Sequence, residues 1–431
     1  MRKMKNSGVA WIGDIPENWK VLRNKNLIYE INEKCTDTTD LPLLSVSEYY
    51  GVAPRADKIH DGQIVSRAET FEGYKICHQD DVVMNIMLAW KRAQAVSSFN
   101  GIVSPAYCVY RKKNNSKLDM TFFNYLIRSD LYISVFKRFS TGIIDSRLRL
   151  YPEKFLALHS HVPPTYEQHK IAKHLNKACN NIENLINNQE QQMEKLKQYK
   201  QSLITEVVTK GLNPNVSMKD SGVEWIGKIP KEWKLSKVSM FYDVTLGKML
   251  QPEKQEETDT LENYLCAANL GNNTLKLNVL KQMWFSQKDK AQYNVKKGDL
   301  IVVEGGDVAS CDIVRSDVSN LYFQNALHRV RAKKGFSLDF LRYNLIMAKS
   351  QGYISLICNK ATIAHFTKDK LMTLPMLYIP LPEQQQIATY LDNKCAKIDR
   401  LIAIKQEKIN KLNDYKKSLI YEYVTGKREV C

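Results

Sequence analysis

The sequence lacks any long hydrophobic run: no stretch approaches the roughly 18 apolar residues that a membrane-spanning helix needs. Behind the basic residues Arg2, Lys3 and Lys5 there is no apolar segment of the kind that forms a signal peptide. The nine cysteines are scattered, odd in number and never spaced as CxxC, which argues against a disulfide framework and against a zinc knuckle. These absences predict a protein of a reducing cytoplasm that makes no membrane contact.

Motifs of catalysis are missing as well. There is no GxGxxG phosphate loop, no Asn/Asp-Pro-Pro-Tyr/Phe motif of an amino-methyltransferase, and no Ser/His/Asp or Cys/His arrangement that could supply a nucleophile. His159 and His161 lie two residues apart and His169 and His174 five apart, and neither spacing puts two imidazoles on one helical face. We therefore expect no catalytic, cofactor-binding or metal-ligating residue in this chain.

Positive charge is in excess. The 431 residues include 63 lysines and arginines against 46 acidic residues, a formal net charge of +17 that is spread along the chain. Such an excess favours an extended polyanionic partner, most simply nucleic acid, because Lys and Arg release condensed counterions from phosphates. A basic protein that merely stays soluble is the alternative at this point, since charge alone decides little.

A long internal repeat organises the sequence. Residues 7–20 return as residues 221–234, and both copies contain Trp-Ile-Gly-x-Ile-Pro-x-x-Trp. Residues 164–209 return as residues 380–425, and both copies contain Glu-Gln-x-x-Ile-Ala near their start. The period is far longer than the roughly 20–50 residues of a solenoid repeat. The repeat therefore indicates two copies of a whole module.

The second repeated segment predicts two long helices. Apolar residues recur every seven positions with no internal Gly or Pro, a pattern typical of a coiled coil, and each segment begins after prolines and ends near a glycine. Neighbouring apolar residues are expected to widen this line into a stripe: Leu185, Ile186, Met193 and Tyr199 in the first helix, and Leu401, Ile402, Ile409 and Tyr415 in the second. The coiled-coil positions are Leu175, Ile182, Gln189, Leu196 and Leu203 in the first helix, and Leu391, Ile398, Lys405, Leu412 and Leu419 in the second.

Both stripes are interrupted by a polar residue at the same heptad, Gln189 in one helix and Lys405 in the other. A polar core residue usually fixes the register or the partner of a coiled coil at some cost in stability. Mutual antiparallel pairing of the two helices, in which the interruptions near mid-helix meet, explains the coincidence best. The alternative is that each helix packs separately on its own globular domain.

The segments between the repeats, residues 20–162 and 235–379, are predicted to be globular. They differ in sequence but share an order of elements, including a buried strand near residues 82–84 in one and 300–303 in the other. We therefore expect an α+β protein with two similar α/β domains separated by two long helices that form an antiparallel coiled coil. The predicted boundaries are 1–162 for the first domain, 163–212 for the central helix, 213–379 for the second domain and 380–431 for the C-terminal helix.

Basic and aromatic residues on predicted loops of both domains are suited to phosphate contacts and base-edge recognition. Each of them taken alone is as consistent with a solvated surface residue, and only the set as a whole indicates nucleic-acid binding. The DNA-binding candidates are Trp90, Lys91, Arg92, Arg147 and Arg149 in the first domain, and Lys248, Arg315, Lys360, His365 and Lys368 in the second.

Taken together, these features resemble the specificity subunit of type I restriction–modification enzymes over essentially the whole chain. The resemblance is carried by the paired openings and paired helix starts, and by single motifs at residues 101–107, 146–151, 304–307 and 324–331. It implies two target-recognition domains, each of which binds one half of a bipartite asymmetric site in double-stranded DNA. It also implies that the coiled coil sets the spacing between the half-sites.

By the same resemblance the chain is non-catalytic and resides in a bacterial or archaeal cytoplasm. Two methyltransferase subunits would dock on the helices and bring S-adenosylmethionine, and restriction/translocase subunits would bring ATP and Mg²⁺. Two other classes of function are weighed against it. One is a DNA-modifying enzyme with an unrecognised active site, and the other is a coiled-coil adaptor that binds only proteins.

Overall fold

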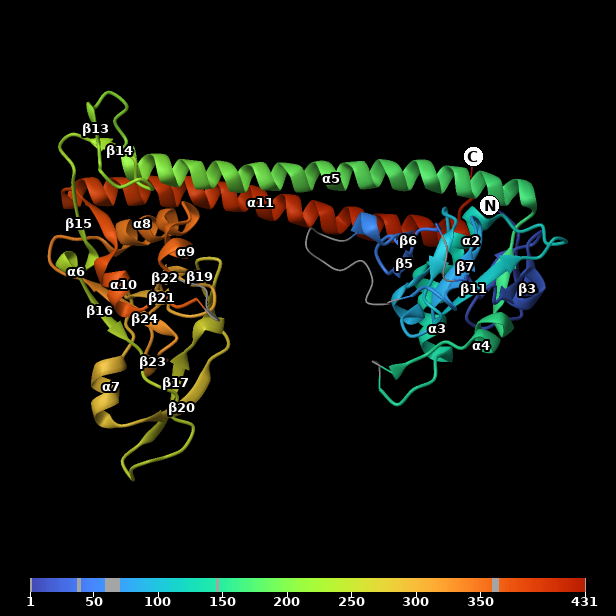
Figure 1. The fold of residues 1–431 in the computed structure, drawn as a ribbon, viewed down its shortest axis with the longest axis horizontal. Coiled ribbons are helices and arrows are strands. Elements are labelled where there is room, and N and C mark those ends of the chain that lie inside the picture. The colour runs from blue at the N-terminus through green and yellow to red at the C-terminus, as the bar shows by residue number, and fades with distance from the viewer. Residues whose placement is uncertain (1, 37–39, 59–69, 145–146, 359–363, 431) are drawn as a thin grey trace. The chain divides into compact units, whose positions relative to one another are not determined.

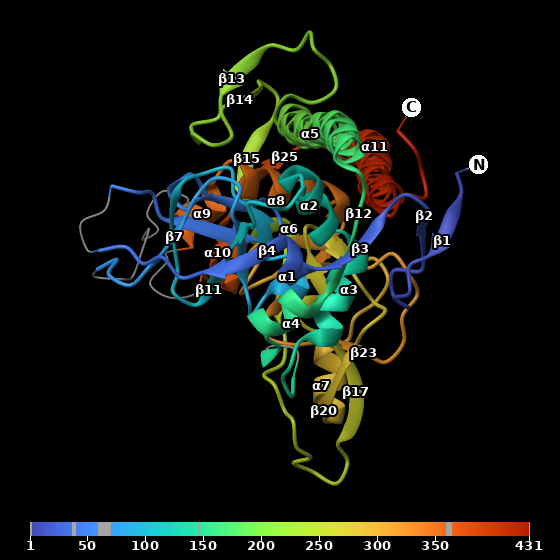
Figure 2. The same cartoon turned by 90° about the vertical axis from the view of Figure 1, so that its right-hand side faces the viewer.

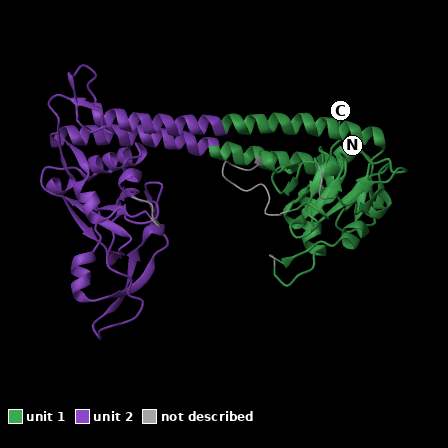
Figure 3. Ribbon diagram, viewed as in Figure 1, with its two compact units in different colours: residues 1–189, 406–431 green, residues 190–405 purple. Residues whose placement is uncertain are grey.

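The computed structural model describes residues 2–36, 40–58, 70–144, 147–358 and 364–430. The chain falls into two compact units, one formed by residues 1–189 with 406–431 and the other by residues 190–405 (Figure 3). Each unit therefore combines one globular domain with part of each long helix.

The repeated helical segments form α5 (Thr165–Lys210) and α11 (Leu381–Val424), of 46 and 44 residues (Figure 1). Within each unit, residues that come later in α5 contact residues that come earlier in α11, so the two helices run antiparallel; Figure 2 shows them side by side, seen nearly end-on. The contacts are Glu183 with Lys416 (2.5 Å) and His174 with Tyr423 (ring centroids 4.5 Å) in the first unit, and Lys200 with Asp399 (2.7 Å) and Gln192 with Lys405 (2.5 Å) in the second.

The heptad positions face the helix–helix contact or the globular domain. Leu196, Leu412 and Lys405 are half-buried, and the other heptad positions are buried: Leu175, Ile182, Gln189, Leu203, Leu391, Ile398 and Leu419.

The expected widening of the stripe is found on one side only: Ile409 is buried and Ile186, Met193 and Ile402 are half-buried, whereas the other four residues are not. Leu185, Tyr199, Leu401 and Tyr415 are 47%, 58%, 48% and 54% exposed. These four residues lie about 40–60° to one side of the heptad line, whereas Ile186 and Ile402 lie on the other side, where they pack against the hydrophobic cores. Four large apolar side chains are thereby left on the helix surface.

The first globular domain is built on an antiparallel sheet with strand order β4-β11-β8-β9. Its central strand β8 is buried at every residue, because Val82–Asn85 lies between two hydrophobic layers. The elements are β1 (Met4–Asn6), β2 (Asp14–Pro16), β3 (Lys20–Arg23), α1 (Asn24–Leu27), β4 (Ile28–Ile31), β5 (Leu44–Ser47), β6 (Gly51–Pro54), β7 (Lys75–Cys77), β8 (Val82–Asn85), β9 (Gln94–Val96), β10 (Gly101–Val103), β11 (Tyr107–Lys112), α2 (Met120–Ile127), α3 (Asp130–Phe139), α4 (Pro152–Ala157) and β12 (His159–Val162).

The second domain repeats this sheet as β16-β24-β21-β22, again antiparallel and again with a fully buried strand, β21, at the position of β8. The elements are β13 (Met218–Asp220), β14 (Lys228–Pro230), β15 (Lys234–Lys237), α6 (Val238–Phe241), β16 (Tyr242–Leu246), β17 (Thr260–Leu265), β18 (Leu270–Gly271), β19 (Thr274–Leu275), β20 (Lys281–Phe285), α7 (Gln287–Tyr293), β21 (Leu300–Val303), β22 (Cys311–Ile313), β23 (Leu321–Phe323), β24 (Leu327–Ala332), α8 (Leu338–Ser350), α9 (Tyr353–Ile357), α10 (Lys368–Thr373) and β25 (Pro375–Tyr378).

The two domains differ in what is added to the shared sheet. The first domain adds the antiparallel pairs β5-β6 and β10-β7. The second adds a three-stranded sheet of order β20-β17-β23, in which β17 and β23 are parallel, together with α7. The common sheet therefore carries different surfaces in the two halves of the chain.

Candidate nucleic-acid interface

The Glu-Gln pair recurs at equivalent positions of both repeats, and the structure explains the role of its glutamine. In the first unit Gln168 accepts a hydrogen bond from the Asp119 backbone N–H (2.7 Å) and donates to the carbonyls of Lys117 (3.1 Å) and Pro163 (2.9 Å). In the second unit Gln384, 216 residues later, accepts from Ser337 N–H (2.9 Å) and donates to the Ile379 carbonyl (2.8 Å). Each buried glutamine thereby links the start of a long helix to the N-terminus of a helix in the globular domain of the same unit, α2 in the first unit and α8 in the second.

The Trp-Ile-Gly openings pack at the same places. Trp19 is fully buried and its indole N–H donates to Glu167 Oε2 (3.1 Å). At the end of α11, Gly426 has φ +71°, and a Cβ there would lie 2.4 Å from Pro16 Cγ. Only glycine combines the left-handed conformation with this close approach. The opening motif of the first unit thus holds the beginning of α5 and the end of α11.

The second unit repeats the arrangement with Trp233 and Gly211, which ends α5. Gly211 has φ +74°, and a Cβ there would meet the Trp233 ring at 3.1 Å. Burial raises the pKa of Glu383, and its hydrogen bond with Trp233 partly offsets that effect. We use the term helical frame for the two opening motifs (residues 11–19 and 225–233) together with α5 and α11.

One face of the frame carries a duplicated ion pair. Glu183 and Lys416 in the first unit correspond, 216 residues apart, to Asp399 and Lys200 in the second. The side chains are between 27% and 55% exposed, so each pair stabilises the helices by only about 0–1 kcal/mol.

The opposite face carries the exposed apolar residues. By the helical angles, Leu185 and Tyr415 project together from the first unit on the side away from the ion pair, and Tyr199 and Leu401 do the same in the second. Leu185 corresponds to Leu401 and Tyr199 to Tyr415 in the repeat. Each unit therefore presents an equivalent Leu–Tyr pair, which we call the apolar patch.

Of the basic candidates in the first domain, Trp90 and Lys91 lie against the end of α3. Trp90 belongs to a short 3₁₀ turn, and the ammonium groups of Lys91 and Lys137 stand over its ring at 4.9 and 5.1 Å. Arg92 is engaged within the protein. It pairs with Asp130 and donates through Nε to the Arg128 carbonyl (3.1 Å).

Arg147 and Arg149 are exposed on the loop that follows α3 and take part in no ion pair with any described residue. The loop is tied to the core by the adjacent Leu150, which is fully buried and donates its backbone N–H to the Ile86 carbonyl at the end of β8 (2.9 Å). The fold thus holds these two arginines on the domain surface, close in sequence to the end of α3.

The candidates in the second domain are more often paired. Lys248 forms an ion pair with Asp289 (2.6 Å) and its side chain is only 14% exposed. Arg315 pairs with Asp339 (2.7 Å), while His365 Nδ1 lies 3.2 Å from Glu304. Lys368 is exposed at the first residue of α10. Lys360 lies outside the described residues.

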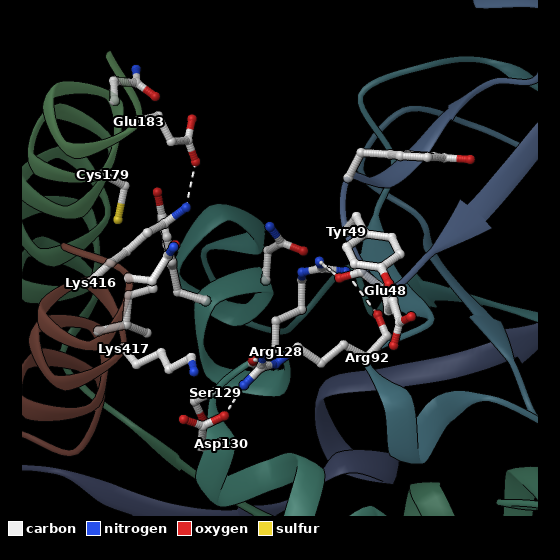
Figure 4. A pocket seen from close by; sticks show the side chains of 16 residues that line it. Glu48, Tyr49, Arg92, Arg128, Ser129, Asp130, Cys179, Glu183, Lys416 and Lys417 are labelled. Atoms are coloured by element: carbon white, nitrogen blue, oxygen red, sulfur yellow. Dashed lines mark hydrogen bonds and ion pairs between the residues drawn. The ribbon is translucent and has the colours of Figure 1, made fainter. Parts of the chain in front are cut away.

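Sequence reasoning missed Arg128, the central cation of a cavity of about 330 Å³ in the first unit (Figure 4). Its guanidinium donates to the backbone carbonyls of Arg92 (3.0 Å), Gln94 (2.7 Å) and Glu48 (3.0 Å). Burial, followed by the charge of Arg92, lowers its pKa to about 10. Arg128 thereby fixes the loop that carries Tyr49, which is 85% exposed. No motif in the sequence signals this role.

Two findings bear on other classes of site. Among the described residues, no group of three or more His, Cys, Asp or Glu side chains is arranged to hold a metal ion. None of the helices in the same part of the chain is both long and apolar enough to cross a membrane.

Residues 230–414 match a family described as "Type I restriction modification DNA specificity domain". The chain is 25% identical over 438 residues to the type I restriction enzyme MjaVIII specificity subunit of Methanocaldococcus jannaschii, a match that covers 96% of this chain and 94% of that protein.

Two solved structures share the fold at 16% identity. One, from work on complex assembly and conformational transition of a type I restriction–modification system, covers 95% of this chain and 98% of its own with a TM-score of 0.70. The other, the HsdS subunit from Thermoanaerobacter tengcongensis, covers 96% and 98% with a TM-score of 0.52.

The predicted fold class, with two related α/β domains and an antiparallel pair of long helices, is therefore confirmed. The duplicated helical frame, the family match and the similar relatives agree: residues 230–414 match the type I restriction–modification DNA specificity domain, and the chain is similar over nearly its whole length to type I specificity subunits.

Proposed function

We propose that the two globular domains of this chain recognise the two halves of a split, asymmetric site in double-stranded DNA. The observation that carries the proposal is the contrast between the frame and the domains. Gln168 and Gln384 fasten the domains to the helices in the same way, whereas β5-β6 and β10-β7 in one domain are matched by β20-β17-β23 and α7 in the other. Equal attachment with unequal surfaces suits one kind of recognition at two different sequences.

The positive charge supports nucleic acid as the partner. The net charge of +17 provides general attraction to phosphates. Arg147, Arg149 and Lys368 are exposed and form no ion pair with a described residue, so they are the candidates best suited to phosphate or base contacts. Lys248 and Arg92 are instead held by neighbouring carboxylates.

The apolar patches are proposed as the docking sites of two methyltransferase subunits. An exposed Leu beside an exposed Tyr at matching positions of both units is costly in water and has no role inside the helix pair. Because the repeat produces two equivalent patches, the frame is suited to two copies of the same partner. Those subunits would bring S-adenosylmethionine, and restriction/translocase subunits would bring ATP and Mg²⁺, in a bacterial or archaeal cytoplasm.

Docking can be tested by counting bound methyltransferase subunits in native mass spectrometry. Replacing both Leu185 and Tyr415 with Asp should leave one subunit per chain, and adding the same changes at Tyr199 and Leu401 should leave none. Asn187→Asp, an exposed polar change on α5, is the matched control and should leave two. Two bound subunits on the four-fold variant would contradict the docking proposal.

The recognition proposal is tested by single-molecule sequencing of methylated DNA from cells with and without this chain. A split motif should vanish when the chain is absent, and exchange of residues 20–162 for those of another family member should change one half of the motif only. Modification by the purified chain alone would favour a DNA-modifying enzyme. Unchanged methylation together with weak, sequence-insensitive DNA binding would favour a protein adaptor.

A further inference from the structure

The loop after α3 exposes apolar side chains where the fold gives no reason for them. Ile143 is 95% exposed and Ile144 is 53% exposed. Leaving an isoleucine fully in water forgoes about 1.5–3 kcal/mol relative to burial. Single exposed apolar residues are normal, but neighbouring ones that lie together can mark a contact surface.

The described part of this loop is held firmly by its backbone. Thr141 and Arg149 exchange two hydrogen bonds of 3.0 Å, and the Arg147 N–H donates to the Ile144 carbonyl (2.8 Å). Gly142 lies so close to the returning chain that a Cβ would stand 2.5 Å from the Arg147 carbonyl oxygen. These contacts hold Thr141 and Gly142 against Arg147 and Arg149, and both isoleucines remain exposed beside them.

The surroundings of the loop are strongly basic. Between residues 131 and 152 the sequence has four basic residues, Lys137, Arg138, Arg147 and Arg149, and one acidic residue, Asp145. All four basic side chains are exposed. Figure 1 shows the loop on the side of its domain away from α5 and α11, so it is free of the helical frame.

Exposed isoleucines next to exposed arginines are suited to a DNA partner. Proteins that distort DNA insert Ile, Leu, Met or Phe between base pairs while neighbouring basic residues neutralise the flanking phosphates. A protein partner for Ile143 would leave Arg147 and Arg149 to be matched by acidic groups, whereas DNA satisfies the apolar and the charged residues together because stacked bases alternate with phosphates along each strand.

We propose that Ile143 and Ile144 form an apolar wedge that enters the base stack of the half-site recognised by the first domain. The wedge would unstack one base step, and recognition would then depend on how easily that step deforms as well as on direct contacts. This inference rests on the proposed DNA-recognition function and adds to it a site of DNA distortion.

The test uses the full chain assembled with its methyltransferase subunits and duplexes that contain the methylated motif. 2-Aminopurine, an adenine analogue that pairs with thymine and whose fluorescence rises on unstacking, replaces in turn each adenine in either strand of the first half-site, apart from the adenine that is methylated. The wild-type complex should raise the fluorescence at one step. Ile143→Ser should abolish the rise and weaken binding about tenfold or more, while Ile143→Leu should keep both.

Gly142→Ala provides a second variant. It keeps both isoleucines in the sequence but displaces the backbone that carries them, so it should also lose the fluorescence rise. The wedge is ruled out if the wild-type complex unstacks no step, or if Ile143→Ser unstacks the same step as wild type. It is equally ruled out if Ile143→Ser impairs assembly with the methyltransferase and leaves DNA binding unchanged. A wild-type complex that neither binds nor methylates a specific motif would instead contradict the recognition function itself.

Discussion

Replacing Gln168 with Ala should loosen the attachment of α5 to the first domain. The side chain makes three hydrogen bonds to backbone groups, and the change leaves Asp119 N–H and the carbonyls of Lys117 and Pro163 without these partners. A typical hydrogen bond contributes about 1 kcal/mol net, and a buried group left unpaired costs about 1–3 kcal/mol. We therefore expect a loss of about 3 kcal/mol in the free energy of unfolding of the first unit.

The second unit supplies an internal comparison. Gln384 makes two such bonds, so Gln384→Ala should destabilise the second unit by about 2 kcal/mol. Hydrogen exchange followed by mass spectrometry measures each unit separately, because peptides from residues 1–189 and 190–405 report on different cores. Each variant should lower protection in its own unit only.

Gln191→Ala is the matched control, since Gln191 is an exposed residue of the same helix and its loss should change stability by less than about 0.5 kcal/mol. The reasoning would be refuted if Gln168→Ala behaved like this control. It would also be refuted if the loss of protection were equal in both units, because the hydrogen bonds described are local to one unit.

Three further predictions follow from single residues. Burial lowers the pKa of His161 to about 4, below its unfolded value of about 6.5, so the unfolded state binds the proton first as the pH falls. The first unit should therefore lose up to about 3 kcal/mol of stability between pH 6.5 and pH 4. His161→Phe should remove this loss in acid-denaturation curves. Arg147→Ala should weaken DNA binding and reduce the salt dependence by about one counterion, whereas Lys248→Ala should lower the melting temperature instead. Gly426→Ala should destabilise the first unit by about 1 kcal/mol or more, measured by urea unfolding, because of its positive φ and contact with the opening motif.

The helical part of the fold could be predicted from sequence because the signal is local and long. Seven-residue recurrence and the flanking prolines and glycines indicate the two long helices that the structure shows as α5 and α11. The exposure of Leu185 and Tyr415 could not be predicted in the same way. A heptad pattern gives the direction of the seam, but its width depends on how many helices pack there.

The candidate interface was less predictable for a different reason. Arg92 and Arg147 look alike in sequence, since both follow an apolar segment in a loop. Asp130 engages the first, and no described carboxylate engages the second. That difference depends on contacts between segments distant in sequence, as does the burial of Arg128 among three backbone carbonyls. Periodicity and composition contain no information about such contacts.

The central claim is that the helices determine the distance between two half-sites that the domains recognise independently. Inserting one heptad after Gln189 and another after Lys405, positions equivalent in the repeat, adds about 10 Å to each helix and keeps the core register. Methylated-motif sequencing in cells that carry this variant should find both half-sites unchanged and the spacer longer by at most about three base pairs. Altered half-sites with an unchanged spacer would contradict the account.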